Sequence, residues 1–276
     1  MYSLNCKGTL IDLSTPRVMG IINVTPDSFY DGGKTMVIRD ILAQAELMLK
    51  EGATFLDIGG YSSRPGADDV TEPDELDRVL PAIEAILNEF PEAILSVDTF
   101  RSNVARKAVD IGACMVNDIS GGAMDEHMIT TVAGLRVPYI AMHMRGTPQT
   151  MSQFTNYEQV TREVLHYFSK RIAETRRAGI NDLIADPGFG FSKTRAQNFT
   201  LMNELEFFQQ LGIPLIVGIS RKSMIYKTLG ISAKEALNGT TALHSIALLK
   251  GANLLRVHDV REAVECIRLV SELSEA

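Results

Sequence analysis

The sequence predicts a (β/α)8 barrel, in which parallel strands alternate with helices, and two observations support this fold. The first is a set of eight short apolar runs, which are typical of strands buried on both faces. The second is helical spacing between these runs, in a chain of 276 residues that suits such a barrel. A doubly wound open sheet is the alternative, but eight runs favour closure. The runs are 18–24, 55–60, 94–98, 114–118, 139–143, 183–186, 215–219 and 254–258.

Helices are expected between the strands. Residues 39–52 place apolar side chains at three- and four-residue steps, and Gly52 supplies a C-terminal stop. Residues 73–88 carry acidic side chains in their first turn, as the helix dipole favours. Residues 1–16 precede the first strand and are expected to form a short hairpin or arm. The other expected helical segments are 101–112, 124–132, 157–179, 200–211, 233–251 and 260–275.

Composition restricts the class of protein. No linker or composition shift divides residues 1–276, so we expect one domain. A net charge of −7 argues against broad binding to nucleic acid or anionic membranes, so an anionic ligand must be held by a few cations. No segment has the length of a membrane span or the apolar core of a secretory signal. Cys6, Cys114 and Cys266 suggest neither disulfides nor a metal site. We therefore expect a cytoplasmic protein.

Polar residues end most of the apolar runs, and in a barrel the strand ends surround the active site. Asp98, Asn117 and Asp186 end three different runs, so the barrel should turn them toward one cavity. A buried carboxylate needs donors, and a heterocycle with an amino group beside a ring N–H offers two. The alternative is that these residues cap backbone N–H groups. The polar ends are Asn23, Asp57, Asp98, Asn117, His143, Asp186, Ser220 with Arg221, and Arg256 with His258.

Several of these ends suit phosphate or a metal ion. Asn23 can offer an oxygen to Mg²⁺, which takes few protein ligands beside phosphate and water. Arg64 lies in a glycine- and serine-rich segment and can form bidentate pairs with phosphate. Arg256 and His258 end the last run, in the part of a barrel that often binds phosphate. Arg64, Arg256 and the titratable ring of His258 are expected to converge on a phosphorylated substrate, although polar surface loops are the alternative for Asn23 and Arg64.

Three further features concern the remaining loops. Arg221 and Lys222 place two cations directly after the seventh run. Residues 186–193 alternate glycines with aromatics, so a flat ligand could stack on a Phe, although packing under the loop is the plain interpretation. His143 is interpreted as either a cavity wall or a structural residue. No nucleophilic triad, zinc spacing or P-loop is present, which predicts a site that binds, orients and stabilises charge.

Seven collinear motifs over roughly residues 17–267 resemble those of the dihydropteroate synthase family. The resemblance implies condensation of 6-hydroxymethyl-7,8-dihydropterin pyrophosphate with p-aminobenzoate, giving 7,8-dihydropteroate and pyrophosphate. It also implies a homodimer formed through late barrel helices and inhibition by sulfonamides. Tyr61 departs from the family pattern, in which Glu is common. The motifs are NVTPDSF (23–29) with DGG (31–33), SSRPG (62–66), SVDT (96–99), ND (117–118), DPGFGF (186–191), SRKS (220–223) and RVHD (256–259).

The resemblance also implies roles for individual residues. The pterin would be held by Asp98, Asn117, Asp186 and Lys222, with Met142 beside them. The pyrophosphate and its Mg²⁺ would be held by Asn23, as the metal ligand, and by Ser63, Arg64, Arg256 and His258. The p-aminobenzoate would be surrounded by Phe29, Pro65, Phe191, Lys222 and Ser223. The catalytic residues would be Asp98, Lys222 and Arg64.

The expected chemistry is an SN1-like displacement. Positive charge grows on the pterin methylene as the C–O bond breaks, and negative charge grows on the pyrophosphate. Each preorganised contact to the leaving anion is expected to lower the barrier by about 3 kcal/mol. Two alternatives remain: a pterin-dependent methyltransferase domain, which has no need of the pyrophosphate-binding residues, and a non-catalytic pterin-binding paralogue.

Overall fold

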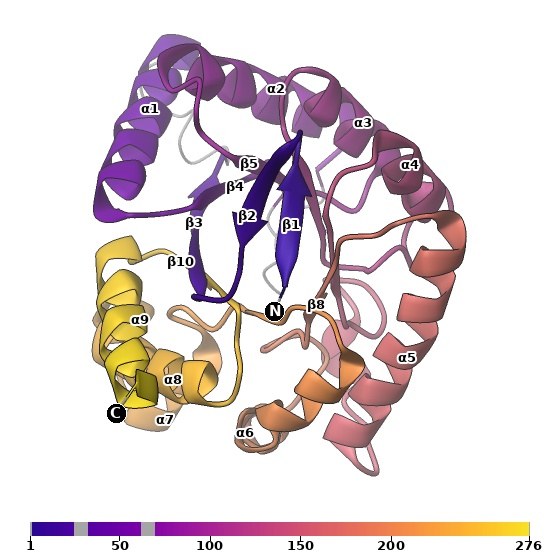
Figure 1. The fold of residues 1–276 in the computed structure, drawn as a ribbon, viewed down its shortest axis with the longest axis vertical. Coiled ribbons are helices and arrows are strands. Elements are labelled where there is room, and N and C mark those ends of the chain that lie inside the picture. Colours follow the sequence, from indigo (N-terminus) through magenta and orange to yellow (C-terminus); the bar gives the residue numbers. More distant parts are fainter. Residues whose placement is uncertain (1, 25–32, 62–69, 276) are drawn as a thin grey trace.

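A computed structural model of the protein describes residues 2–24, 33–61 and 70–275. The barrel strands are β3 (Arg17–Asn23), β4 (Phe55–Gly59), β5 (Leu95–Asp98), β6 (Met115–Asp118), β7 (Tyr139–Met142), β8 (Leu183–Asp186), β9 (Ile216–Val217) and β10 (Leu254–Val257). They form one parallel sheet in the order β8-β7-β6-β5-β4-β3-β10-β9. A single bridge between Ala185 and Leu215 joins its two ends, so the sheet curls into a nearly closed barrel (Figure 1). The predicted fold is confirmed.

The helices form a ring outside the strands (Figure 1). They are α1 (Gly33–Glu51), α2 (Glu72–Glu89), α3 (Ser102–Asp110), α4 (Met128–Leu135), α5 (Val160–Ala178), α6 (Arg195–Asn203), α7 (Ser223–Leu229), α8 (Leu237–Leu249) and α9 (Val260–Glu275). Short 3-10 turns are η2 (Met151–Gln153), η3 (Leu205–Leu211) and η4 (Ala233–Glu235). The segment predicted as one helix at 200–211 is the end of α6 followed by η3. The α7 helix was not predicted, because it has only seven residues and begins close to a strand end.

The N-terminal segment is a hairpin, as expected. Strand β1 (Ser3–Cys6) pairs antiparallel with β2 (Thr9–Asp12), and Figure 1 shows them across one end of the barrel. Leu4, Cys6 and Leu13 are buried against the first inward-facing residues of the barrel strands. The hairpin therefore covers the end where the strands begin, which leaves the opposite end for a site.

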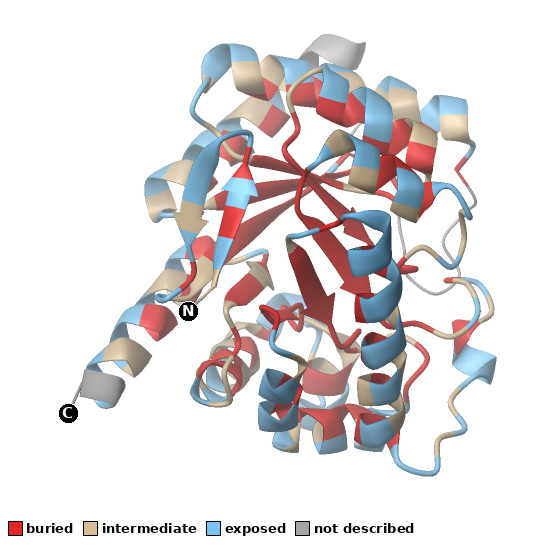
Figure 2. Cartoon of the chain, turned by 45° about the vertical axis from the view of Figure 1, so that its right-hand side comes forward, coloured by how far each residue is buried: buried red, intermediate tan, exposed pale blue. Residues whose placement is uncertain are grey.

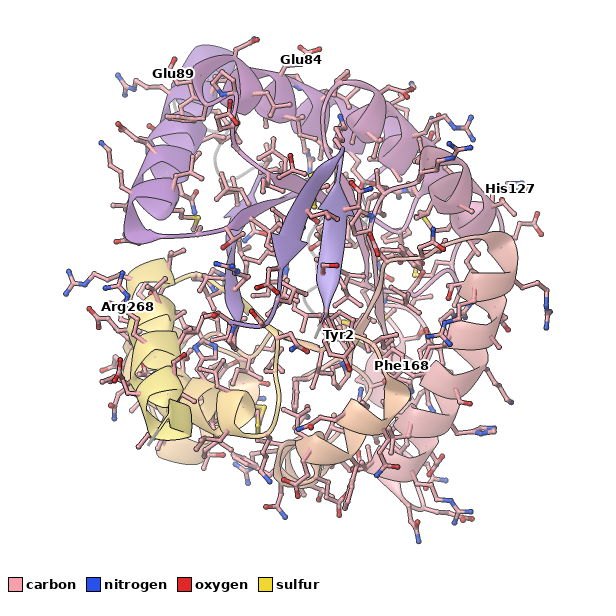
Figure 3. The ribbon with its side chains drawn as sticks, in the orientation of Figure 1. Tyr2, Glu84, Glu89, His127, Phe168 and Arg268 are labelled. Atoms are coloured by element: carbon pink, nitrogen blue, oxygen red, sulfur yellow. The ribbon has the colours of Figure 1, made fainter. Side chains whose placement is uncertain are left out.

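Burial follows the layers of the barrel. Figure 2 shows the buried residues on the strands and on the inner faces of the helices. Phe168 of α5 is fully buried in the core between the strands and helices, whereas Glu84, Glu89 and Arg268 lie on the outer surface (Figure 3). Among the helices of the described residues, none is long and apolar enough to cross a membrane.

Candidate active site

Alternate residues of each barrel strand face the interior, and along the strands these residues change from apolar to polar. The layer nearest the hairpin contains Met19, Phe55, Met115, Ile140, Ile184, Ile216 and Leu254. Two residues further along the same strands stand Ile21, Asp57, Asn117, Met142, Asp186, Gly218 and Arg256. Because a step of two keeps a side chain on the same face, the second layer places polar groups inside the barrel, beside the end that the hairpin leaves open.

An ion-pair network joins Asp57, Asn117 and Arg256 of this layer to Asp98, which ends β5. Arg256 donates from Nε to Asp57 Oδ2 at 2.6 Å and from Nη2 to Asp98 Oδ2 at 2.6 Å. Asn117 donates from Nδ2 to the same oxygen of Asp57 at 2.8 Å. The structure thus brings together Asp98, Asn117 and Arg256, three of the predicted site residues. Asp57 completes the network; it was named among the polar strand ends, but no role was predicted for it.

The carboxyl group of Asp98 titrates near neutral pH. Burial raises its pKa to about 7, although Arg256 opposes this effect and the negative charges of Asp57, Glu75 and Asp118 add to it. A carboxyl group with this pKa is present in both protonation states around pH 7.

Lys222 and Asp186 form the second part of the site. Lys222 donates from Nζ to the Phe189 carbonyl oxygen at 2.6 Å, and the same nitrogen lies 4.7 Å from the centre of the Phe191 ring. Asp186 Oδ1 accepts a hydrogen bond from the Gly188 N–H at 2.8 Å. Burial raises the pKa of Asp186, although the positive charge of Lys222 opposes this effect. Burial also lowers the pKa of Lys222 to about 8, although the negative charge of Asp186 opposes it.

Only one of the two phenylalanines in this loop suits stacking with a ligand. Phe189 is fully buried in the hydrophobic core, so its packing role is confirmed. Phe191 is partly exposed and contacts Lys222, as expected of a residue beside a flat ligand.

Other predicted residues lie at the rim of the site. His258 is exposed after β10, and its Nδ1 lies 3.1 Å from Ser220 Oγ. Ser223 begins α7 and is half-buried, while Met142 is buried in the polar layer. The predicted residues outside the described ranges are Phe29, Ser63, Arg64 and Pro65.

Asn23 is exposed at the end of β3, and its amide oxygen fits a single protein ligand to Mg²⁺. Within 2–24, 33–61 and 70–275, no group of three or more His, Cys, Asp or Glu side chains could hold a metal. One exposed amide oxygen at the end of β3 suits a metal that takes most of its ligands from substrate phosphate and water.

Arg221 turns away from the site. It donates from Nε and Nη2 to the two carboxylate oxygens of Asp259, both at 2.8 Å, and also bonds the Ala233 carbonyl oxygen. Of the two cations after the seventh strand, Lys222 alone contacts Phe189 and Phe191 beside Asp186.

His143 supports the loop beside the site. Its Nδ1 lies 3.1 Å from Lys193 Nζ, which also donates to the carbonyl oxygens of Gly188 at 3.0 Å and Phe191 at 3.1 Å. Burial, with the neighbouring charge of Lys193, holds the pKa of His143 well below its ordinary value. The structural interpretation of His143 is the one these contacts favour.

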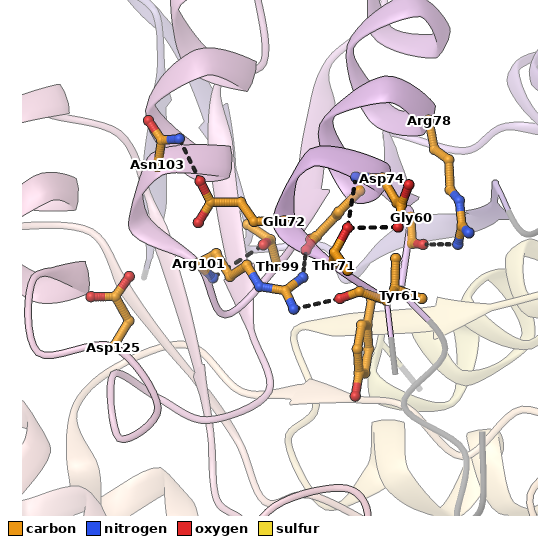
Figure 4. Close-up of polar contacts among 12 residues, drawn as sticks. Gly60, Tyr61, Thr71, Glu72, Asp74, Arg78, Thr99, Arg101, Asn103 and Asp125 are labelled. Carbon is orange, nitrogen blue, oxygen red and sulfur yellow. Dashed lines mark hydrogen bonds and ion pairs between the residues drawn. The ribbon is translucent and has the colours of Figure 1, made fainter. Parts of the chain in front are cut away.

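Side chains from neighbouring elements fix the two segments that flank residues 62–69 (Figure 4). Arg78 of α2 donates to the Gly60 carbonyl oxygen at 3.0 Å. Arg101 donates to the Val70 carbonyl oxygen at 2.6 Å and forms an ion pair with Glu75. These contacts hold both flanks in place near the ends of β4 and β5.

Tyr61 packs in the same region. Its ring meets Phe100 edge-on, with 5.0 Å between the ring centres, and its hydroxyl accepts a hydrogen bond from Gln149 Nε2 at 2.6 Å. Tyr61 is therefore a buried packing residue of this chain, where Glu is common in the family it resembles.

Replacing Arg101 with alanine is expected to destabilise the protein by about 1–3 kcal/mol, because the buried carboxylate of Glu75 loses its cation. Burial already raises the pKa of Glu75 above its ordinary value, and loss of Arg101 should raise that pKa further. In the folded state of Arg101→Ala, Glu75 is protonated more readily than in wild type. The difference in unfolding free energy between the two proteins should therefore be small near pH 4.5 and grow as the pH rises toward 8. Urea unfolding of both proteins at several pH values measures this, and a pH-independent difference would contradict it.

Comparison with known proteins agrees with these features. Residues 19–258 match the family of pterin binding enzymes. The chain is 44% identical to the dihydropteroate synthase of Escherichia coli (strain K12) over 269 residues, covering 97% of this chain and 95% of that protein.

Two solved structures of Xanthomonas albilineans dihydropteroate synthase resemble the whole barrel. The complex with 4-aminobenzoic acid has a TM-score of 0.92 at 40% identity, covering 99% of this chain and 98% of that one. The complex with 7,8-dihydropteroate has a TM-score of 0.89 at 38% identity, covering 100% of both chains. With relatives this similar along its length, the chain belongs to the dihydropteroate synthase family of pterin-binding enzymes.

Proposed function

We propose that this protein condenses 6-hydroxymethyl-7,8-dihydropterin pyrophosphate with p-aminobenzoate, giving 7,8-dihydropteroate and pyrophosphate. The observation that carries the proposal is the buried polar layer, in which a network of Asp98, Asn117 and Arg256 lies in the same barrel interior as Asp186. Its carboxylates and amide can bind the donor-rich edge of a pterin, and its guanidinium can face an anion. The relatives solved with 4-aminobenzoic acid and with 7,8-dihydropteroate support this substrate and this product.

Gly218 contributes no side chain to the second layer, and a Cβ placed there would already be in ordinary contact with Arg256 at 3.8 Å and Asp186 at 4.0 Å. The backbone at Gly218 therefore leaves Asp186 and Arg256 uncovered by a side chain from the end of β9. We propose that the pterin lies beside Asp186. The 2-amino group and N3–H of the ring would donate to Asp186, with Asn117 and Met142 beside the ring.

The same residues suit the charges that develop in the reaction. When the C–O bond breaks, the oxygen leaves with the electron pair, the methylene becomes cationic and the pyrophosphate gains negative charge. Arg256 and His258, with Arg64, would stabilise the departing anion, and the Asp98 carboxylate would stabilise the cation. The p-aminobenzoate nitrogen then bonds to the methylene and releases a proton, in an SN1-like displacement.

We propose further ligand contacts from the remaining predicted residues. Mg²⁺ held by Asn23 and the substrate would add positive charge to the leaving group. Ser63 would donate to the pyrophosphate. The p-aminobenzoate would lie against Phe191, Lys222 and Ser223, with Phe29 and Pro65 completing its surroundings; Lys222 and Phe191 already contact each other.

Pyrophosphate release tests the proposal. The purified protein is given the dihydropterin pyrophosphate and Mg²⁺, with and without p-aminobenzoate. Release that depends on p-aminobenzoate and accompanies formation of dihydropteroate is the expected result. Tight pterin binding without release would instead support a methyltransferase domain or a non-catalytic paralogue.

We also propose that the enzyme is a cytoplasmic homodimer formed through α7, α8 and α9. Apolar side chains are exposed on this group of neighbouring helices (Figure 1). They are Leu229, Ile246, Leu249, Leu269 and Leu273, of which Leu249 is 61% and Leu269 is 70% exposed. A second copy of the chain would cover these side chains by symmetry.

Replacing Leu249 with glutamate is expected to weaken the dimer by at least tenfold, because burying one leucine contributes about 1.5–3 kcal/mol and a buried carboxylate adds a penalty. Sedimentation over a range of concentrations measures the change. Leu47→Glu on α1, where the leucine is also exposed (56%), is the matched control and should leave the dimer unchanged. Equal dissociation constants for wild type and Leu249→Glu would exclude this interface.

A further inference from the structure

Asp57 holds two residues of the site but is itself inaccessible. Its side chain is fully buried, and one oxygen, Oδ2, accepts from both Asn117 Nδ2 and Arg256 Nε. Its other oxygen, Oδ1, has no hydrogen-bond partner among the described residues. All of the bonds the structure gives to this carboxylate therefore come from side chains of the site.

Asp118 shows what a structural aspartate looks like in the same barrel. Its oxygens accept from the backbone N–H groups of Ser120 and Gly122 and from the hydroxyl of Tyr139. Such bonds fix a turn and leave no carboxylate oxygen without a donor. In the part of the chain that the structure describes, the Asp57 carboxylate accepts from no backbone N–H group, so a turn-forming role does not account for it.

The bond to Asn117 determines which way that amide faces. A carboxylate accepts hydrogen bonds, so the NH₂ group of Asn117 must face Asp57 and the carbonyl oxygen must point elsewhere. The amide of Asn117 is thereby fixed in one of its two orientations, with its oxygen as an acceptor for a ligand.

The bond to Arg256 fixes the guanidinium plane. Asp57 binds Nε while Asp98 binds Nη2, and two contacts on a planar group determine its position and tilt. The guanidinium is thereby oriented before a substrate arrives.

We propose that Asp57 is a positioning residue for the reaction: it orients the amide of Asn117 for the pterin and the guanidinium of Arg256 for the leaving group, without contacting substrate. This inference rests on the proposed function. It also predicts an electrostatic effect on Asp98, which faces Arg256, Asp57, Glu75 and Asp118 and influences Lys222. Because the charge of Asp57 raises the pKa of Asp98, removing that charge should lower it.

The test compares Asp57→Ala with Asp57→Asn. Both should fold, because Arg256 keeps its ion pair with Asp98. Asp57→Ala removes the acceptor, so kcat/KM for the pterin pyrophosphate should fall at least tenfold. Asp57→Asn keeps an acceptor oxygen and should restore part of this loss. Because it removes the negative charge, the acid limb of the pH profile, where kcat/KM falls as the pH decreases, should move to lower pH.

Ser96→Ala is the matched control. Ser96 stands opposite Asp57 in the β4–β5 register and is equally buried, and its hydroxyl has no partner among the described residues. This variant should retain the wild-type kcat/KM and acid limb. If Asp57→Ala and Asp57→Asn folded and also matched wild type in both quantities, the inference would be wrong.

Binding of 6-hydroxymethylpterin, measured by calorimetry, separates this inference from the proposed function. If wild type forms no dihydropteroate, the proposed function is wrong. The inference about Asn117 is then still supported if Asp57→Ala binds this pterin at least tenfold more weakly than wild type, and overturned if the affinities are equal.

Discussion

Replacing Asp98 with asparagine is expected to slow turnover by about 100- to 1000-fold, the effect of removing one preorganised charge-stabilising group. The amide keeps the shape of the side chain and can still accept from Arg256 Nη2, which now bonds Asp98 Oδ2. What disappears is the negative charge beside the developing cation. The loss should therefore appear in kcat, while the melting temperature stays close to that of wild type.

The pH profile provides the decisive measurement for Asp98. With a pKa of about 7, the carboxylate form grows as pH rises, so wild-type kcat/KM should increase with pH through this region. Asp98→Asn should lack this limb. Asp182→Asn is the control, because that carboxylate accepts from the backbone of Asn5 in the N-terminal hairpin. Turnover close to wild type in Asp98→Asn would remove this residue from the mechanism.

The sequence was most informative where a site residue ends a strand. Asp98, Asn117 and Asp186 were expected to meet because parallel strands end at one edge, and they do lie at the same end of the barrel. Asp57 was named among the polar ends of the apolar runs but was given no role. Asp57 lies two residues after Phe55, and Asn117 lies two residues after Met115, so strand periodicity places both in the second layer inside the barrel. This pattern could have predicted Asp57 as a site residue from the sequence.

Other features depended on contacts that no local pattern contains. Arg221 has a φ of 54°, a left-handed conformation that is rare for arginine, and this turns it toward Asp259. The support of His143 by Lys193 joins residues 50 positions apart. Such pairings arise from tertiary packing, and periodicity in the sequence carries no trace of them.

Replacing Lys222 with alanine is expected to weaken binding of both the pterin and p-aminobenzoate. The lysine donates to the Phe189 carbonyl oxygen, contacts the face of Phe191 and is the largest favourable charge acting on Asp186. Loss of this favourable charge beside a buried carboxylate is expected to cost about 2 kcal/mol or more, so pterin affinity should fall by roughly 30-fold or more.

The effect of Lys222→Ala should depend on pH. Without this cation the pKa of Asp186, already raised by burial, rises further, and a protonated carboxyl group cannot accept two donors from the pterin. Pterin affinity of the variant should therefore improve as pH increases, whereas p-aminobenzoate affinity should stay low because the contact with Phe191 is gone. Calorimetric titrations at pH 6 and pH 8 measure both. Lys227→Ala, an exposed lysine on the same helix, is the control, and unchanged affinity of Lys222→Ala for both ligands would show that neither binds at this residue.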